Sequence, residues 1–212
     1  LPDPVMFEAL EQRLLLAVAP VVDTPIGPVT VNEGAAATLV DLFNHFSDPD
    51  ITGVVYQFQG TMDTFNVHLF ENQKPVTTAN FRAYADAGDW TNTFIHRSVP
   101  GFIIQGGGFT FANGLFGDVN DGDPIINEPG ISNTRGTIAM AKLGGDPNSA
   151  TNEWFFNLAD NSANLDNQNG GFTVFGEVLG SGMDVIDAIA EMPTYDGTSI
   201  DPALTDVPLQ NY

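Results

Sequence analysis

Cysteine and histidine, the side chains that most often act as nucleophiles, bases or metal ligands, are scarce in this sequence. It has no cysteine, which excludes thiol nucleophiles, disulfides and cysteine-ligated zinc or iron–sulfur sites. Its three histidines, His45, His68 and His96, lack the spacing of metal ligands, and we expect His96 to be structural. The triple glycine at residues 106–108 lacks the following lysine of a phosphate-binding loop. We therefore predict neither a metal nor a cofactor.

One acidic segment, DVNDGD at residues 118–123, suggests a calcium-binding loop. The EF-hand pattern requires glycine at its sixth position and glutamate at its twelfth. Counting from Asp118 satisfies neither requirement, whereas counting from Asp166 satisfies both. However, residues 172–178 are predicted to be a strand, and no flanking helix is available. The sequence thus argues against an EF-hand and leaves calcium in another kind of loop as an alternative.

The sequence carries a large excess of negative charge. Six lysines and arginines stand against 27 aspartates and glutamates, which gives a formal net charge of −21 at pH 7. Nucleic acids and anionic membrane surfaces attract basic patches, so we expect neither as a partner. No apolar run approaches the roughly 20 residues of a membrane-spanning helix. The lack of cysteine is compatible with an oxidising compartment, and a periplasmic or secreted location is favoured over a cytoplasmic one.

Residues 1–52 are predicted to form an N-terminal appendage. Met6, Leu10, Leu14 and Ala17 recur at the spacing of one helical face, which predicts an amphipathic helix within residues 1–22. The remnant of an export segment is the alternative interpretation of this stretch. Residues 20–50 are rich in proline and predict an extended strap, with short strands at residues 21–22 and 29–31 and a short helix at residues 37–46.

From residue 53 onward, short strands alternate with turns rich in glycine, asparagine and aspartate. Strands are predicted at residues 54–59, 64–70, 93–95, 102–105, 137–141, 154–158 and 172–178. One helix is predicted to begin at Pro75, and a second at residues 181–191, where Ser181 can cap it. The pattern indicates a mainly β fold, a closed antiparallel barrel with helical lids over residues 53–192, followed by a tail at residues 193–212.

The segment FIHRSVPGFIIQGGGF at residues 94–109 resembles the cyclophilin-type peptidyl-prolyl cis-trans isomerases. Further blocks agree with this family in the same order: PVTTANF at 75–81, GTIAMA at 136–141, SATN at 149–152, WFFN at 154–157 and FTVFGEV at 172–178. The resemblance covers about residues 53–192. It implies an eight-stranded antiparallel barrel that is closed at each end by a helix.

The resemblance also implies an isomerase that rotates X–Pro bonds in proline-containing polypeptides and so assists protein folding. Arg97 is implied as the catalytic arginine, with Glu153 next to it, and Gln105 is implied to hold the substrate backbone. The implied proline pocket is lined by Phe102, Ile103, Phe155, Leu165 and Phe172. The implied groove for the residues before the proline is flanked by Asn113, Gly114, Ala141 and Lys142.

Several positions depart from the family pattern. Glu153 replaces a glutamine beside the catalytic arginine, so we expect activity to change as Glu153 titrates. Asn164 stands where animal cyclophilins have a tryptophan that binds cyclosporin, and we expect weak cyclosporin inhibition. Phe172 replaces a frequent histidine and keeps the pocket wall apolar. Lys142 and Leu143 replace an Asn-Ala pair, which predicts a different residue preference in the groove.

Two other functions are compatible with the residues. The same barrel could hold proline-containing segments without turnover, although the presence of both Arg97 and Gln105 argues against this binding module. The acidic surface and the Asp- and Pro-rich leader would also suit a structural or adhesive surface domain. Within the strap, the Gly27-Pro28 bond could occupy the pocket of its own or a neighbouring chain, but packing outside the site is the simpler expectation.

Overall fold

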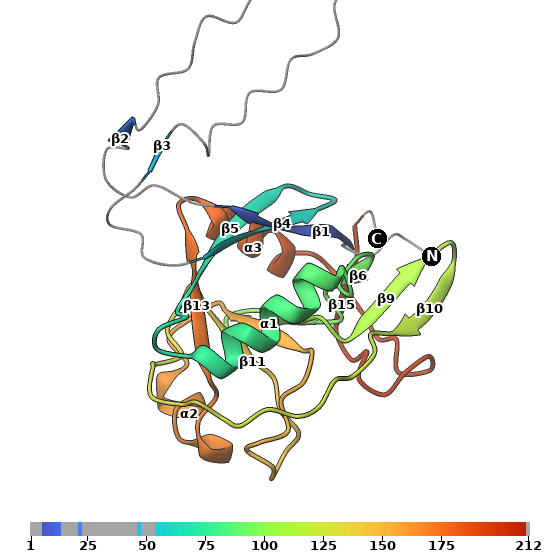
Figure 1. Ribbon diagram of the computed structural model, residues 1–212. Coiled ribbons are helices and arrows are strands. Elements are labelled where there is room, and N and C mark those ends of the chain that lie inside the picture. Colours follow the sequence, from blue (N-terminus) through green and yellow to red (C-terminus); the bar gives the residue numbers. More distant parts are fainter. Residues whose placement is uncertain (1–5, 14–20, 23–45, 48–53, 211–212) are drawn as a thin grey trace, which may run out of the picture. The chain divides into compact units, whose positions relative to one another are not determined.

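The computed structural model describes residues 6–13, 21–22, 46–47 and 54–210 (Figure 1). The chain divides into two compact units, one of Leu1–Arg13 with Gly53–Tyr212 and one of Leu14–Thr52. In the second unit, strands β2 (Val21–Val22) and β3 (Phe46–Ser47) pair antiparallel, which confirms the short strand predicted at residues 21–22. The strand predicted at residues 29–31 and the Gly27-Pro28 bond lie outside the described residues, as does the predicted helix at residues 37–46 apart from Phe46.

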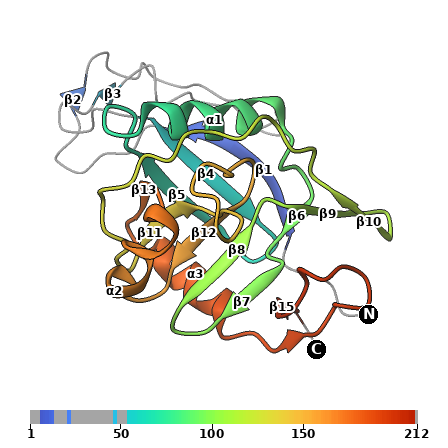
Figure 2. The ribbon, with the colours of Figure 1, turned by 90° about the horizontal axis from the view of Figure 1, so that it is seen from below.

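The first unit is built on one curled sheet of eleven strands (Figures 1 and 2). These strands are β1 (Met6–Arg13), β4 (Val55–Gly60), β5 (Thr64–Leu69), β6 (Thr93–Phe94), β7 (Arg97–Val99), β8 (Ile103–Gly106), β9 (Phe109–Ala112), β10 (Leu115–Asp118), β11 (Thr137–Met140), β12 (Trp154–Asn157) and β13 (Val174–Leu179). Their order is β10-β9-β6-β1-β4-β5-β13-β11-β12-β8-β7, and every pairing is antiparallel. The mainly β fold is therefore confirmed. Closure into an eight-stranded barrel stays a prediction, because the hydrogen-bonded order ends at β10 and β7.

The amphipathic helix predicted within residues 1–22 is wrong where the structure describes this stretch. Met6–Arg13 form strand β1, which pairs with β4 along its length and with β6 at one end. A helix of this length is marginal in water, because few hydrogen bonds offset the cost of starting it. A strand inserted between β4 and β6 instead satisfies backbone donors and acceptors on both sides. Tertiary pairing therefore overrides the helical spacing of the apolar residues.

Aromatic side chains from opposing strands fill the interior of the curled sheet. Phe58 of β4 and Phe65 of β5 are cross-strand partners, and their rings stack with centroids 4.9 Å apart. Phe156 of β12 meets both rings edge-on at 5.4 Å. Because side chains alternate along a strand, an inward Phe156 leaves Phe155 and Asn157 on the other face of β12. That outer face carries the candidate site.

Two longer helices pack against the sheet at the predicted places. They are α1 (Pro75–Ala87), which ends at Gly88 with a left-handed φ of 75°, and α3 (Gly182–Ala190). Phe81 of α1 and Ile186 of α3 are fully buried in the core. A short helix, α2 (Ser162–Leu165), and a 3-10 turn, η1 (Gln168–Gly170), were not predicted. None of the helices in the described part of the chain is long and apolar enough to cross a membrane.

Residues 193–210 pack against the strand that begins at Arg97. Strand β14 (Thr194–Tyr195) pairs with β15 (Val207–Pro208), and apolar residues of this stretch join a buried cluster with side chains of β6 and β9. The carbonyl of Asp206 accepts a hydrogen bond from the backbone N–H of Ser98 at 2.8 Å. This contact gives β7 a backbone partner on the side opposite β8.

Candidate active site

A tight hairpin brings two candidate residues side by side. The turn at residues 99–102 has Pro100 at its second position and Gly101, with φ of 73°, at its third. This is the residue pattern of a type II turn, and a backbone hydrogen bond of 3.0 Å closes it. Strands β7 and β8 then pair so that Arg97 lies directly opposite Gln105.

The same register continues into the next two strands. Gln105 of β8 pairs with Phe155 of β12, and Phe155 pairs with Ala139 of β11. Directly paired residues place their side chains on the same face of a sheet. Arg97, Gln105 and Phe155 therefore form one row across three strands, which combines a cation, an amide and an aromatic ring.

This row lines a cavity of about 320 Å³. The remaining lining comes from the β7–β8 turn, the segment after β11, helix α2 and the residues around η1. The complete set is Arg97, Phe102, Ile103, Gln105, Ala141, Lys142, Phe155, Asn164, Leu165, Gln168 and Phe172. The structure thus brings together nine residues that the resemblance assigned to catalysis or substrate binding. Gln168 was missed, because the 3-10 turn that places it has no periodic pattern in the sequence.

Two predicted groove residues lie elsewhere. Asn113 and Gly114 form the tip of the β9–β10 hairpin, with φ of 54° and 76°. They line neither this cavity nor a second, larger cavity that adjoins it. A two-residue hairpin turn favours Asn-Gly, because both positions require positive φ. This conformational requirement accounts for the dipeptide, and its role in a substrate groove stays a prediction.

The guanidinium of Arg97 differs from those of Arg82 and Arg135 in having no carboxylate partner among the described residues. Arg82 pairs with Glu71 at 2.6 Å, and Arg135 pairs with Asp187 at 2.5 Å. No described residue forms an ion pair or a side-chain hydrogen bond with Arg97, which is half-buried. Its donors are therefore available to a ligand in the cavity.

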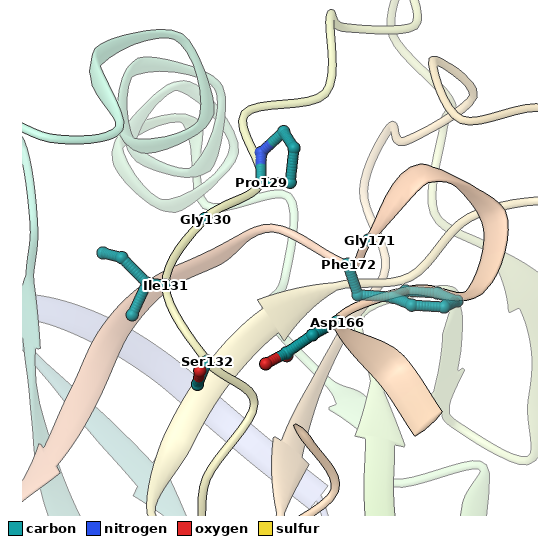
Figure 3. A pocket seen from close by; sticks show the side chains of 7 residues that line it. All are labelled: Pro129, Gly130, Ile131, Ser132, Asp166, Gly171 and Phe172. Carbon is teal, nitrogen blue, oxygen red and sulfur yellow. The ribbon is translucent and has the colours of Figure 1, made fainter. Parts of the chain in front are cut away.

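Phe172 lines both this cavity and a smaller one of about 80 Å³ (Figure 3). Its ring meets Phe155 edge-on at 5.7 Å, and the Lys142 Nζ lies 4.8 Å from its centroid. The Lys142 amine also donates to the carbonyls of Asn169 at 2.9 Å and Gly171 at 2.7 Å, and burial lowers its pKa. Lys142 thus holds the loop that carries Phe172. The smaller cavity is lined by Pro129, Gly130, Ile131, Ser132, Asp166, Gly171 and Phe172.

The triple glycine allows the chain after β8 to pass close to β12. A Cβ on Gly106 would lie 2.8 Å from the ring of Trp154, and a Cβ on Gly108 would clash with the carboxylate of Glu153. The motif therefore has a steric role, since it makes room for two consecutive side chains of the neighbouring segment.

Glu153 connects the candidate site with a buried histidine. Its Oε2 accepts a hydrogen bond from Gln105 Nε2 at 2.6 Å and lies 3.6 Å from His96 Nε2. Burial raises the pKa of Glu153, and the bond from Gln105 opposes this increase. Burial, with a smaller contribution from the charge of Arg97, lowers the pKa of His96 to about 4. The imidazole is therefore neutral near pH 7, and its contact with Glu153 is not an ion pair at that pH.

A second cavity, of about 600 Å³, adjoins the first and shares three lining residues with it. Three carboxylates line it, those of Asp121, Asp146 and Glu153. Its one cation, Lys142, is held by backbone carbonyls. Sequence patterns contained no signal for Asp121 and Asp146 in this role, because only the fold brings their two loops together.

Metal binding finds no support within the described part of the chain. There, no group of three or more histidine, aspartate or glutamate side chains could hold a metal ion. The described residues include the acidic segment at 118–123, for which the sequence left a calcium loop open.

Comparison with known proteins identifies relatives with one common activity. A family profile described as "Cyclophilin type peptidyl-prolyl cis-trans isomerase/CLD" matches residues 55–211. A peptidyl-prolyl cis-trans isomerase of Acinetobacter baylyi is 37% identical over 147 residues, which cover 68% of this chain and 76% of the relative. Peptidyl-prolyl cis-trans isomerase B of Escherichia coli is 40% identical over 134 residues, which cover 60% and 79% of the two chains.

Solved structures share the fold. The crystal structure of a cyclophilin type peptidyl-prolyl cis-trans isomerase of Cryptosporidium parvum matches with a TM-score of 0.51 and 22% identity, over 72% of this chain and 94% of that one. A crystal structure of the same protein in the presence of the dipeptide Ala-Pro matches with a TM-score of 0.52 and 22% identity, over 72% and 96%. At this level of identity the likeness concerns the fold alone.

Proposed function

Because this chain belongs to the cyclophilin-type peptidyl-prolyl cis-trans isomerases and is an enzyme of that class, we propose that Arg97 catalyses the rotation of X–Pro bonds. One observation carries this proposal: Arg97, whose side chain has no described partner, lines the same cavity as Phe102, Phe155 and Phe172. The rings offer an apolar site for a proline side chain. Arg97 supplies a cation beside this apolar site. The other cation that lines the cavity, Lys142, is already engaged by the loop that carries Phe172.

The chemistry follows from the electronic structure of the peptide bond. Its partial double-bond character creates a rotation barrier of about 18–20 kcal/mol. At the twisted midpoint conjugation is lost, so the prolyl nitrogen becomes pyramidal and can accept a hydrogen bond. A fixed guanidinium donates to that nitrogen only in this state, which lowers the barrier without a covalent step. Lowering it by about 7 kcal/mol accelerates the rotation roughly 10⁵-fold.

We assign the remaining lining residues to substrate positioning. Gln105, directly opposite Arg97, contacts the substrate backbone, and the second cavity holds the residues that precede the proline. The substrates are unfolded or flexible polypeptides, in which uncatalysed X–Pro exchange takes tens to hundreds of seconds and limits folding. Weak cyclosporin inhibition stays a prediction for Asn164, which lines the first cavity.

Exchange spectroscopy on an Ala-Pro peptide tests the proposed function. We expect catalytic amounts of the protein to produce cis–trans exchange cross-peaks at mixing times of about a second, far shorter than the uncatalysed exchange. Peptide binding without such cross-peaks would support the non-catalytic binding module and reject catalysis.

We expect turnover to decrease as the pH falls through the pKa of Glu153. Protonation removes the charge-assisted hydrogen bond that the carboxylate accepts from Gln105. Because burial raises this pKa, the decrease begins at a higher pH than an exposed glutamate would cause. The expected decrease is about three- to tenfold, which is less than the roughly tenfold or more that a hydrogen bond to a buried charged group contributes, since Glu153 is partly exposed. Exchange rates measured from about pH 4 to pH 8 check this prediction.

The control for this pH dependence is Glu153→Gln. The amide cannot ionise, so the variant should turn over at a rate that is constant across the acidic range. A wild-type rate that does not change with pH, or the same change in Glu153→Gln, would contradict a role for this carboxylate.

We also expect the enzyme to prefer a basic residue before the Ala-Pro unit. Lys-Ala-Pro should exceed Glu-Ala-Pro in kcat/KM by about fivefold at low ionic strength, because Asp121, Asp146 and Glu153 give the second cavity a negative potential. Added salt should reduce this ratio. Asp121→Asn should also reduce the ratio of the two kcat/KM values. The control is Asp184→Asn, which makes the same charge change on α3 and should leave this ratio unaltered. An unchanged ratio in Asp121→Asn would reject the electrostatic explanation.

A further inference from the structure

Three asparagines form a buried relay behind two walls of the first cavity. Asn133 and Asn157 are completely buried, and Asn161 is 9% exposed. At one end of the relay, Asn161 Nδ2 donates to the carbonyl of Phe102 at 2.9 Å. At the other end, Asn133 Nδ2 donates to the carbonyl of Phe172 at 3.1 Å. The two ends therefore hold the backbones of wall residues that are distant in the sequence.

Asn157 joins the two ends of this relay. Its Nδ2 donates to Asn133 Oδ1 at 3.2 Å and to Thr137 Oγ1 at 2.9 Å. Its Oδ1 accepts from Asn161 Nδ2 at 2.8 Å. The amide thus uses both donors and its acceptor, and Asn157 itself is absent from the lining of both cavities.

Asn133 is also held by the carboxylate of Asp166, through two hydrogen bonds. Asp166, whose side chain is labelled in Figure 3, accepts from the backbone N–H of Asn133 at 2.8 Å and from its Nδ2 at 3.0 Å. A buried amide is costly unless it is fully bonded, and an apolar side chain would fill the same space without that requirement. A satisfied buried network, however, fixes one arrangement of the elements that it connects.

We infer that Asn157 is a positioning residue, which sets the separation of the Phe102 and Phe172 walls through Asn161 and Asn133. The inference rests on the proposed function, because it concerns the cavity assigned to the proline ring. A displaced wall weakens the contacts of the ring in the ground state and in the transition state alike. The loss should therefore be seen in KM rather than in kcat.

Asn157→Leu tests this inference, because it keeps the branched shape and the number of heavy atoms of the side chain, with two bulkier methyl groups, and removes the amide. We expect KM for an X–Pro peptide to rise about fivefold or more, while kcat changes by less than about threefold. The ¹³C chemical shift of the Phe172 carbonyl should also move. Ile186→Ala is the matched control: it removes buried side-chain volume from α3, lines neither cavity, and should lower the melting temperature while leaving KM within about twofold.

Each outcome of the experiment decides the inference. If Asn157→Leu does not fold, Asn161→Ala at the less buried end should raise KM by a similar factor. A folded relay variant with KM within about twofold of the wild type, or an equal rise in Ile186→Ala, would overturn the inference. Lack of turnover by the wild type would reject the proposed function instead. The Kd of the Ala-Pro peptide would then decide the inference: a rise of about fivefold or more in Asn157→Leu would support it, and a Kd within about twofold of the wild type would overturn it.

Discussion

Replacing Arg97 with alanine is expected to lower kcat/KM for X–Pro exchange by about 10²–10³-fold, the usual cost of removing one preorganised donor to the transition state. The loss should fall mainly on kcat, because the prolyl nitrogen accepts the hydrogen bond only while the peptide bond is twisted. Arg97→Lys should recover part of the activity. A lysine keeps the charge, but it lacks the rigid planar fork that holds the donor in place. Exchange spectroscopy at several peptide concentrations separates the two constants.

The matched control for this experiment is Arg135→Ala. It removes the same charge, and its guanidinium pairs with Asp187 away from both cavities, so activity should stay within about twofold of the wild type. Thermal unfolding of Arg97→Ala should resemble that of the wild type, because no described residue pairs with the Arg97 side chain. An Arg97→Ala enzyme that retains at least about a third of its turnover would reject Arg97 as the catalytic residue.

The second large effect is expected on stability, from Gly107→Ala. Gly107 has a φ of +89°, and an added Cβ would lie 2.6 Å from the carbonyl oxygen of Asn152 and 2.8 Å from Trp154 Nε1. The unfavourable φ costs about 1–2 kcal/mol, and overpacking adds about 1–3 kcal/mol. At roughly 2–4 °C per kcal/mol for a chain of this size, the melting temperature should fall by about 4–20 °C.

Gly180→Ala separates the two causes of this loss. Gly180 also has a positive φ, of +58°, but no atom lies within 4 Å of its added Cβ. The free energy of unfolding of Gly180→Ala should therefore fall only by the conformational cost of the positive φ, about 1–2 kcal/mol. Equal losses in the two variants, measured by urea unfolding, would show that the close approach of β12 to the triple glycine contributes nothing.

Much of the candidate site could be predicted, because its residues are concentrated in short segments. The stretch at residues 94–109 contains Arg97, Phe102, Ile103 and Gln105, which the resemblance of this stretch to a known family assigned to the site, and the structure places them in a hairpin that lines one cavity. What could not be predicted depends on loops that meet only in the folded chain. The carboxylates of the second cavity and the asparagine relay belong to this class, because no residue in either set has a distinctive neighbour in the sequence.

The sequence by itself determined the turn that precedes β8, because Pro100 and Gly101 favour the backbone angles of a type II turn. Only the tertiary structure decided the state of Met6–Arg13, which suits a helix by its spacing and becomes β1 between two strands that it can pair with. The tertiary structure likewise decided which residues surround the proline site. Backbone angles are a local property, whereas strand partners and cavity walls come from segments that are far apart along the chain.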